Sequence, residues 1–135
     1  MLVEIEVSLV QIGAPVHEFG TPSLSLDEAL WTYLSPQIVE LKAATREEID
    51  LYGIANFHDK NLEILEKYLE HGRDRLQREE VSLIVIDLGE ECGPDGYKRL
   101  LYDLDVPQSG ETLSQIVEMI ARARAERLAV RFRGQ

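Results

Sequence analysis

The sequence predicts a single α+β domain spanning residues 1–135, and three observations support this. The chain has 135 residues, of which 44% are hydrophobic and 29% are charged, a balance typical of one globular domain. Segments with a two-residue hydrophobic period are interspersed with segments of helical period. Their order is one strand, several helices, two strands, a helix and a final strand. That order is typical of one mixed sheet with helices packed mostly on one face.

The expected sheet has about four strands, at approximately 2–10, 81–88, 97–106 and 128–133. In the first, apolar and polar residues alternate, as in a half-solvated strand. The second, VSLIVIDL, is apolar on both faces, which predicts a central strand covered on two sides. In the last, apolar residues alternate with Arg131 and Arg133, which predicts an edge or half-exposed strand.

The segment 97–106 fits two periods. Leu100, Tyr102 and Leu104 alternate as in a strand, but apolar residues also recur there at helical spacing. We favour the strand, because Pro-Asp-Gly just before it suits a hairpin and Pro107 ends it.

Capping signals and apolar spacing predict the helices. Their expected first residues are Ser25, Ser35, Thr45, about Asp59 and Thr112. The first, third and last begin with a Ser or Thr followed three residues later by Glu or Gln, which is a capping box. The second has a proline at its first helical position. The fourth, through about Glu80, is the clearest, with leucines at spacings of three and four. Gly and Pro make residues 11–24 a surface loop.

The charge balance narrows the expected partners. The chain has 25 acidic and 14 basic residues, a formal net charge of −11. Such a surface repels phosphate backbones, so nucleic acid is not an expected partner. Five arginines in residues 119–135 are expected to pair within the chain. No apolar run approaches the roughly 20 residues of a membrane span, and no signal peptide is recognised. With the single cysteine Cys92 excluding an internal disulfide, a cytoplasmic protein without membrane association is expected.

Local catalytic and cofactor motifs are missing from the sequence. It contains neither of the glycine-rich phosphate-binding patterns, and its three histidines lack metal-ligand spacing. Cys92 follows Glu90 and Glu91, which disfavour the thiolate that a nucleophile needs. We therefore predict no catalytic, cofactor-binding or metal-ligating residue, and no cofactor.

Acidic residues concentrate in one nineteen-residue stretch, and they are the predicted partner-binding residues. They are Asp87, Glu90, Glu91, Asp95, Asp103 and Asp105. If residues 81–106 form a hairpin, the last two are expected to approach the others. Turns also favour such residues, so a merely solvated surface is the alternative.

Three functions remain open, and we favour the first over the other two. The first is a non-enzymatic inhibitor or immunity-type protein that docks a basic partner, such as a nuclease toxin, through electrostatic complementarity. The second is a small hydrolase or lyase that uses these carboxylates, with His58 or His17. The third is a homodimer or other homo-oligomer, built through the exposed edge of strand 2–10 or strand 128–133, with a structural or accessory role.

Overall fold

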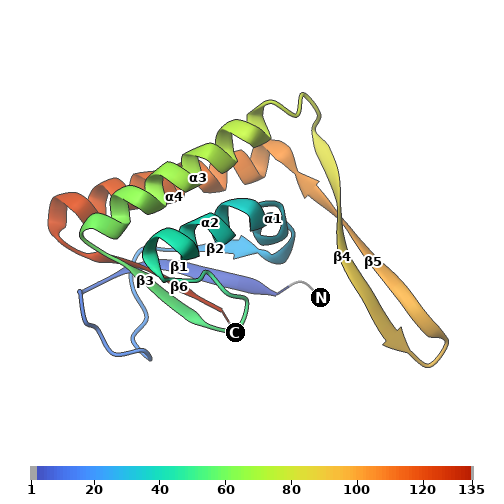
Figure 1. The fold of residues 1–135 in the computed structure, drawn as a ribbon, viewed down its shortest axis with the longest axis horizontal. Helices are drawn as coiled ribbons and strands as arrows, with labels where there is room; N and C mark the ends of the chain where they lie inside the picture. Colours follow the sequence, from blue (N-terminus) through green and yellow to red (C-terminus); the bar gives the residue numbers. More distant parts are fainter. Residues whose placement is uncertain (1–2, 135) are drawn as a thin grey trace.

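Two antiparallel sheets and four helices make up the fold in a computed structural model, which describes residues 3–134 (Figure 1). In chain order, the elements are β1 (Glu4–Val10), β2 (Ser23–Asp27), α1 (Glu28–Tyr33), α2 (Ser35–Thr45), β3 (Ile54–Phe57), α3 (Lys60–Gln77), β4 (Leu83–Gly93), β5 (Gly96–Asp105), α4 (Val106–Glu126) and β6 (Ala129–Arg133). The predicted α+β class is therefore confirmed.

The larger sheet has the strand order β2-β1-β6-β3, and all its pairings are antiparallel. Side chains alternate across it, so Ile5, Val7 and Leu9 of β1 share the face that packs on the helices. Val7 lies opposite Phe132, whose ring meets that of Phe57 edge-on at a centroid distance of 5.6 Å. These buried aromatic and aliphatic side chains form the floor of the core.

The helices cover one face of this sheet, with α3 and α4 lying side by side (Figure 1). The leucine pattern of α3 is directed inward as predicted, because Leu62, Leu65, Leu69 and Leu76 are all buried. A Cβ atom at Gly72 would lie only 2.4 Å from Cδ2 of Leu34. The glycine therefore lets α3 approach the end of α1 closely.

The expected single mixed sheet is wrong in two respects. Every pairing is antiparallel, and residues 81–88 and 97–106 do not join the sheet of the first and last strands. They pair only with each other, as the separate hairpin β4–β5, which projects from the body (Figure 1). The strand assignment of 97–106 is confirmed. Residue 2, which was expected to begin the first strand, lies outside the described residues.

The edge position predicted for 128–133 is also wrong, because β6 lies between β1 and β3. The loop of residues 11–22 covers the outer side of this strand, and Arg131 is only 2% exposed. Two short strands escaped prediction. Strand β2 lies across the end of the predicted loop of residues 11–24 and the predicted helix start at Ser25, and β3 has only four residues.

Several helix starts differ from the predicted ones. The N-cap of α1 is Asp27, whose carboxylate accepts a hydrogen bond from the backbone N–H of Leu30 at 2.8 Å. Residues 46–53 contain no helix; Thr45 instead ends α2 and accepts from the N–H of Glu47. Helix α4 starts at Val106, because Asp105 caps it and Pro107 fits its first turn.

Candidate functional site

The β4–β5 hairpin, residues 83–105, is the part of the molecule that projects from the body, and we call it the arm (Figure 1). Its strands pair from Leu83 opposite Asp105 to Gly93 opposite Gly96. A bulge between Asp87 and Glu90 shifts the register once. All six predicted partner-binding residues lie on this one element.

The inner face of the arm holds it to the body. This face carries Ile84, Ile86 and Leu88 from β4, with Leu100, Tyr102 and Leu104 from β5. Ile86 is 8% exposed and Leu104 1% exposed, and both belong to the hydrophobic core. Two-stranded hairpins are barely stable alone in water. The arm is therefore anchored where this face packs on the helices.

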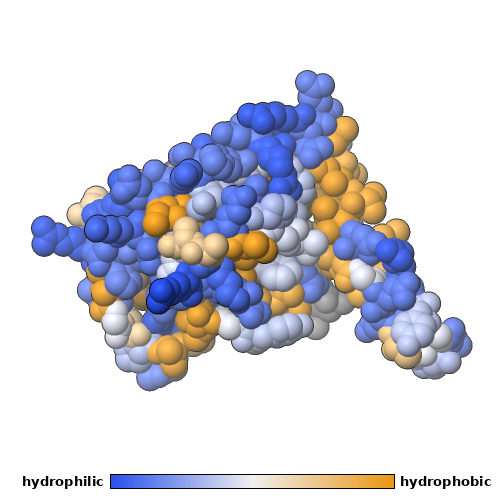
Figure 2. Space-filling model, in the orientation of Figure 1, coloured by the Kyte–Doolittle hydropathy of each residue, from blue (hydrophilic) through white to orange (hydrophobic). Residues whose placement is uncertain are grey.

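The outer face points away from the core. It carries Leu83, Val85, Asp87, Glu90 and Cys92 from β4, with Tyr97, Arg99, Leu101, Asp103 and Asp105 from β5. Leu83, Val85 and Leu101 are 53%, 63% and 56% exposed. Figure 2 shows hydrophobic residues gathered on the part of the arm nearest the helices, whereas the tip is mostly hydrophilic. Clusters of exposed aliphatic side chains are common at interaction surfaces of proteins.

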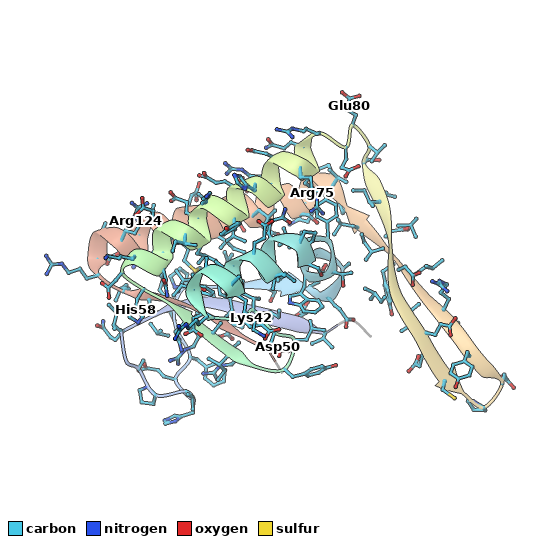
Figure 3. The ribbon with its side chains drawn as sticks, in the orientation of Figure 1. Lys42, Asp50, His58, Arg75, Glu80 and Arg124 are labelled. Carbon is cyan, nitrogen blue, oxygen red and sulfur yellow. The ribbon has the colours of Figure 1, made fainter. Side chains whose placement is uncertain are left out.

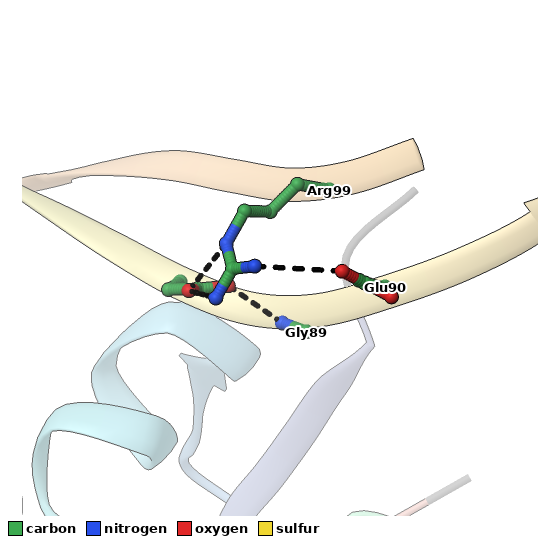
Figure 4. Close-up of polar contacts among 4 residues, drawn as sticks. Gly89, Glu90 and Arg99 are labelled. Carbon is green, nitrogen blue, oxygen red and sulfur yellow. Dashed lines mark hydrogen bonds and ion pairs between the residues drawn. The ribbon is translucent and has the colours of Figure 1, made fainter. Parts of the chain in front are cut away.

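The centre of the outer face holds an ion-pair cluster (Figure 4). Nε of Arg99 donates to Oδ2 of Asp87 at 2.8 Å, and Nη1 of Arg99 lies 3.5 Å from Oε1 of Glu90. The backbone N–H of Gly89 donates to the other Asp87 oxygen at 2.9 Å. The Gly89 N–H and the Arg99 guanidinium together hold the pKa of Asp87 below its ordinary value. Asp87 and Glu90 are thus partly satisfied inside the arm.

Asp105, at the base of the arm, has a structural role. Its Oδ1 accepts from the backbone N–H of Gln108 at 2.9 Å and caps α4. A shallow hollow of about 600 Å³ opens beside it. Its lining residues are Ser82, Leu83, Asp105, Pro107, Gln108 and Glu111. The hollow continues the outer face onto the first turn of α4.

The remaining predicted acids lie in three places. Asp103 is exposed on the outer face opposite Val85, and no hydrogen bond or ion pair within residues 3–134 involves its side chain. Glu91 pairs with Lys98 on the other side of the strands, and Asp95 lies in the turn at the tip. The hairpin therefore unites the six residues on one element, but it spreads them along its length.

This spread bears on the carboxylate-enzyme hypothesis. Asp105 lies opposite Leu83, four residues along β4 from Asp87, which separates the two by about 13 Å at strand geometry. Paired catalytic carboxyl groups lie within about 10 Å of each other. Asp103 is nearer, as a diagonal neighbour of Asp87, but Asp87 is held by Arg99. His58 lies at the opposite end of the molecule from the arm and contacts Asp59 at 2.7 Å (Figure 3).

Sequence reasoning missed that the loop of residues 11–22 packs on Arg131 and Arg133 of β6. Arg131 donates to the backbone oxygens of Ala14 and Pro15 at 2.8 and 2.7 Å, and Nε of the same residue donates to Asn56 at 2.7 Å. Arg133 donates to the Glu18 carbonyl at 2.7 Å, and its guanidinium lies 4.4 Å from the centre of the Phe19 ring. The alternation in β6 suggests that these arginines are exposed to solvent, and it gives no indication that a loop covers them.

Of the five arginines in residues 119–135, Arg122 and Arg124 also pair within the chain, as the sequence predicts. Arg124 of α4, labelled in Figure 3, donates to Glu66 of α3 at 3.2 Å. Arg122 pairs with Glu126 one turn along its own helix. The first contact links the two long helices, and the second lies within α4. Four of these five arginines therefore find a partner within the protein.

Among residues 3–134, no group of three or more His, Cys, Asp or Glu side chains is placed to hold a metal ion. Within the same part of the chain, each helix is too short or too polar to cross a bilayer. The chain matches no protein-family model, no curated protein and no solved structure.

Proposed function

We propose that this chain is a non-enzymatic binding protein whose arm docks a partner protein with a basic surface. The observation that carries the proposal is the outer face of the arm, where exposed aliphatic side chains stand among carboxylates on a projecting element. An apolar patch supplies the affinity of a protein interface, and complementary charge supplies steering and selectivity.

Charge favours a basic partner over a second copy of the chain. The arm carries six acidic residues against two basic ones, Lys98 and Arg99. Two such arms facing each other would bring like charges together, which is unfavourable. A basic partner meets the same charges with the opposite sign, and its association is accelerated at low ionic strength.

The fuller form of the proposal is an inhibitor of the immunity type that covers a basic enzyme, such as a nuclease. A nucleic-acid enzyme has the positively charged cleft that a projecting acidic element fits. We also propose a cytoplasmic setting, where a reducing environment keeps the exposed thiol of Cys92 from forming disulfides.

The test compares wild type with two variants of equal charge change. Tagged wild type, Glu90→Lys/Glu91→Lys and Glu40→Lys/Glu63→Lys are each used to capture proteins from host lysate in low salt and in high salt. The second pair of residues is exposed on α2 and α3, away from the arm. We expect wild type and the helix variant Glu40→Lys/Glu63→Lys to retain a basic protein at low salt. The arm variant Glu90→Lys/Glu91→Lys should lose that protein. Equal capture by all three proteins, or oligomers of this chain alone, would contradict the proposal.

A further inference from the structure

The outer face repeats one cross-strand pairing three times. Leu83 lies opposite Asp105, Val85 opposite Asp103, and Leu101 opposite Asp87, so an aliphatic residue faces an aspartate each time. Directly opposed side chains on a sheet lie about 5 Å apart at Cβ. An aliphatic group and a carboxylate do not satisfy each other. The side chain that suits both is lysine or arginine, with an apolar stem and a cationic end.

One of the three pairs already holds such a side chain. Arg99 follows the outer face beside Leu101, and its guanidinium reaches across the strands to Asp87 at 2.8 Å. The other two pairs contain no basic residue of the arm. Leu83 and Val85 are both more than half exposed, and Asp103 has no polar partner among the described residues. The protein thus fills the pair nearest the tip and leaves the two nearest the body open.

We infer that the two open pairs receive two lysine or arginine side chains from alternate positions of an extended segment of the partner. Successive same-face positions on a strand lie about 7 Å apart, which is also the spacing of alternate residues in an extended chain. A segment aligned with β4 would place one stem on Leu83 with its charge at Asp105, and the next on Val85 with its charge at Asp103. This inference rests on the proposed function and specifies the partner's chemistry.

Charge complementarity identifies this occupant. The two open pairs present Asp103 and Asp105, with Glu111 lining the hollow that continues from them. Asp105 keeps an oxygen for a partner, because the cap of α4 uses Oδ1. A partner strand with apolar residues alone would leave these carboxylates desolvated and unpaired, which is costly.

Three labelled peptides of equal length and composition test the spacing. In one, two arginines are separated by a single residue; in the second they are adjacent; in the third they are four residues apart, as on one face of a helix. Binding to the full chain is followed by amide NMR at low salt. We expect the first peptide to bind roughly fivefold more tightly than the others, since adjacent residues of an extended chain point to opposite sides. The shifts should be centred on residues 83–85 and 103–105.

Two isosteric variants show whether the aspartates carry the preference. Asp103→Asn and Asp105→Asn remove charge while keeping size, and asparagine still caps a helix. We expect each to reduce the preference for the alternating peptide, whereas Glu40→Gln, exposed on α2 away from the arm, leaves it intact. Equal binding of the three peptides, tighter binding of the helical spacing, or no effect of Asp103→Asn would overturn this inference. Those results would leave the proposed function standing if Glu90→Lys/Glu91→Lys still abolished capture of the partner.

Discussion

The body and the arm place their aliphatic side chains in opposite environments, buried in the body and partly exposed in the arm. In β1 and β6 the aliphatic side chains on the helix side are fully covered, and the polar face of the sheet is itself partly covered by the loop of residues 11–22. In β4 and β5 the inner face is covered only near the helices, and the outer face exposes Leu83, Val85 and Leu101. Stability therefore resides in the body, whereas the exposed apolar surface of the arm adds little to it.

The largest effect on stability is expected at the buried side chains of the larger sheet. Phe132→Ala should lower the free energy of unfolding by about 3–5 kcal/mol, because it opens a cavity beside Phe57 in a fully buried site. Chemical denaturation checks this value. A loss in the free energy of unfolding as small as that of a surface substitution would mean that Phe132 and Phe57 are not tightly packed.

A second test concerns the buried arginine. Arg131→Leu should cost about 2–4 kcal/mol, because it leaves the carbonyl oxygens of the loop and Asn56 without their donor. Hydrogen exchange should rise in residues 11–22 and remain unchanged in the arm. An equal rise in hydrogen exchange in residues 11–22 and in the arm would mean that the body and the arm are not independent in stability.

The two faces of the arm give a sharper comparison. Ile86→Ala, on the inner face, should cost about 2 kcal/mol, because that side chain belongs to the core. Val85→Ala, one residue away on the outer face, should change the free energy of unfolding by less than about 0.5 kcal/mol. Denaturation of the two variants side by side measures the contrast. Equal costs would show that the outer face is also packed.

The smallest effect is a pH dependence at the centre of the arm. Asp87 has a pKa below its ordinary value, so its contribution to stability is complete above about pH 4, the unfolded value, and is lost as pH falls through the folded pKa. Amide NMR of the arm should show loosening only below about pH 4. In Asp87→Asn this component should disappear, while the titration of the remaining acids persists.

Much of the body follows from local signals, and the arm shows where those signals fail. The leucines of α3 and the alternation in β1 gave correct elements because one face of each is buried. The VSLIVIDL segment is apolar on both faces, and periodicity cannot distinguish a second protein layer from an exposed surface. Its second face, with Leu83 and Val85, proved to be exposed.

The polar residues of the site were less predictable than the fold. The acids were found by their density along the chain, but their separate roles depend on register. Asp105 caps α4 and Asp87 binds Arg99, whereas Asp103 has neither role. The bulge between Asp87 and Glu90 decides which of them share the outer face, and a shift of one residue reverses that assignment.

The position of β6 has a consequence for how the protein is made. This strand is the last in the chain order, yet it lies between β1 and β3. As the chain emerges from the ribosome, β1 can pair with β2, but β3 has no neighbour until residues 129–133 appear. The two halves of the sheet are thus joined only after the arm and α4 have been synthesised. Completion of the body is therefore a late event, during which nascent β1 and β3 each present an open edge that a chaperone can shield.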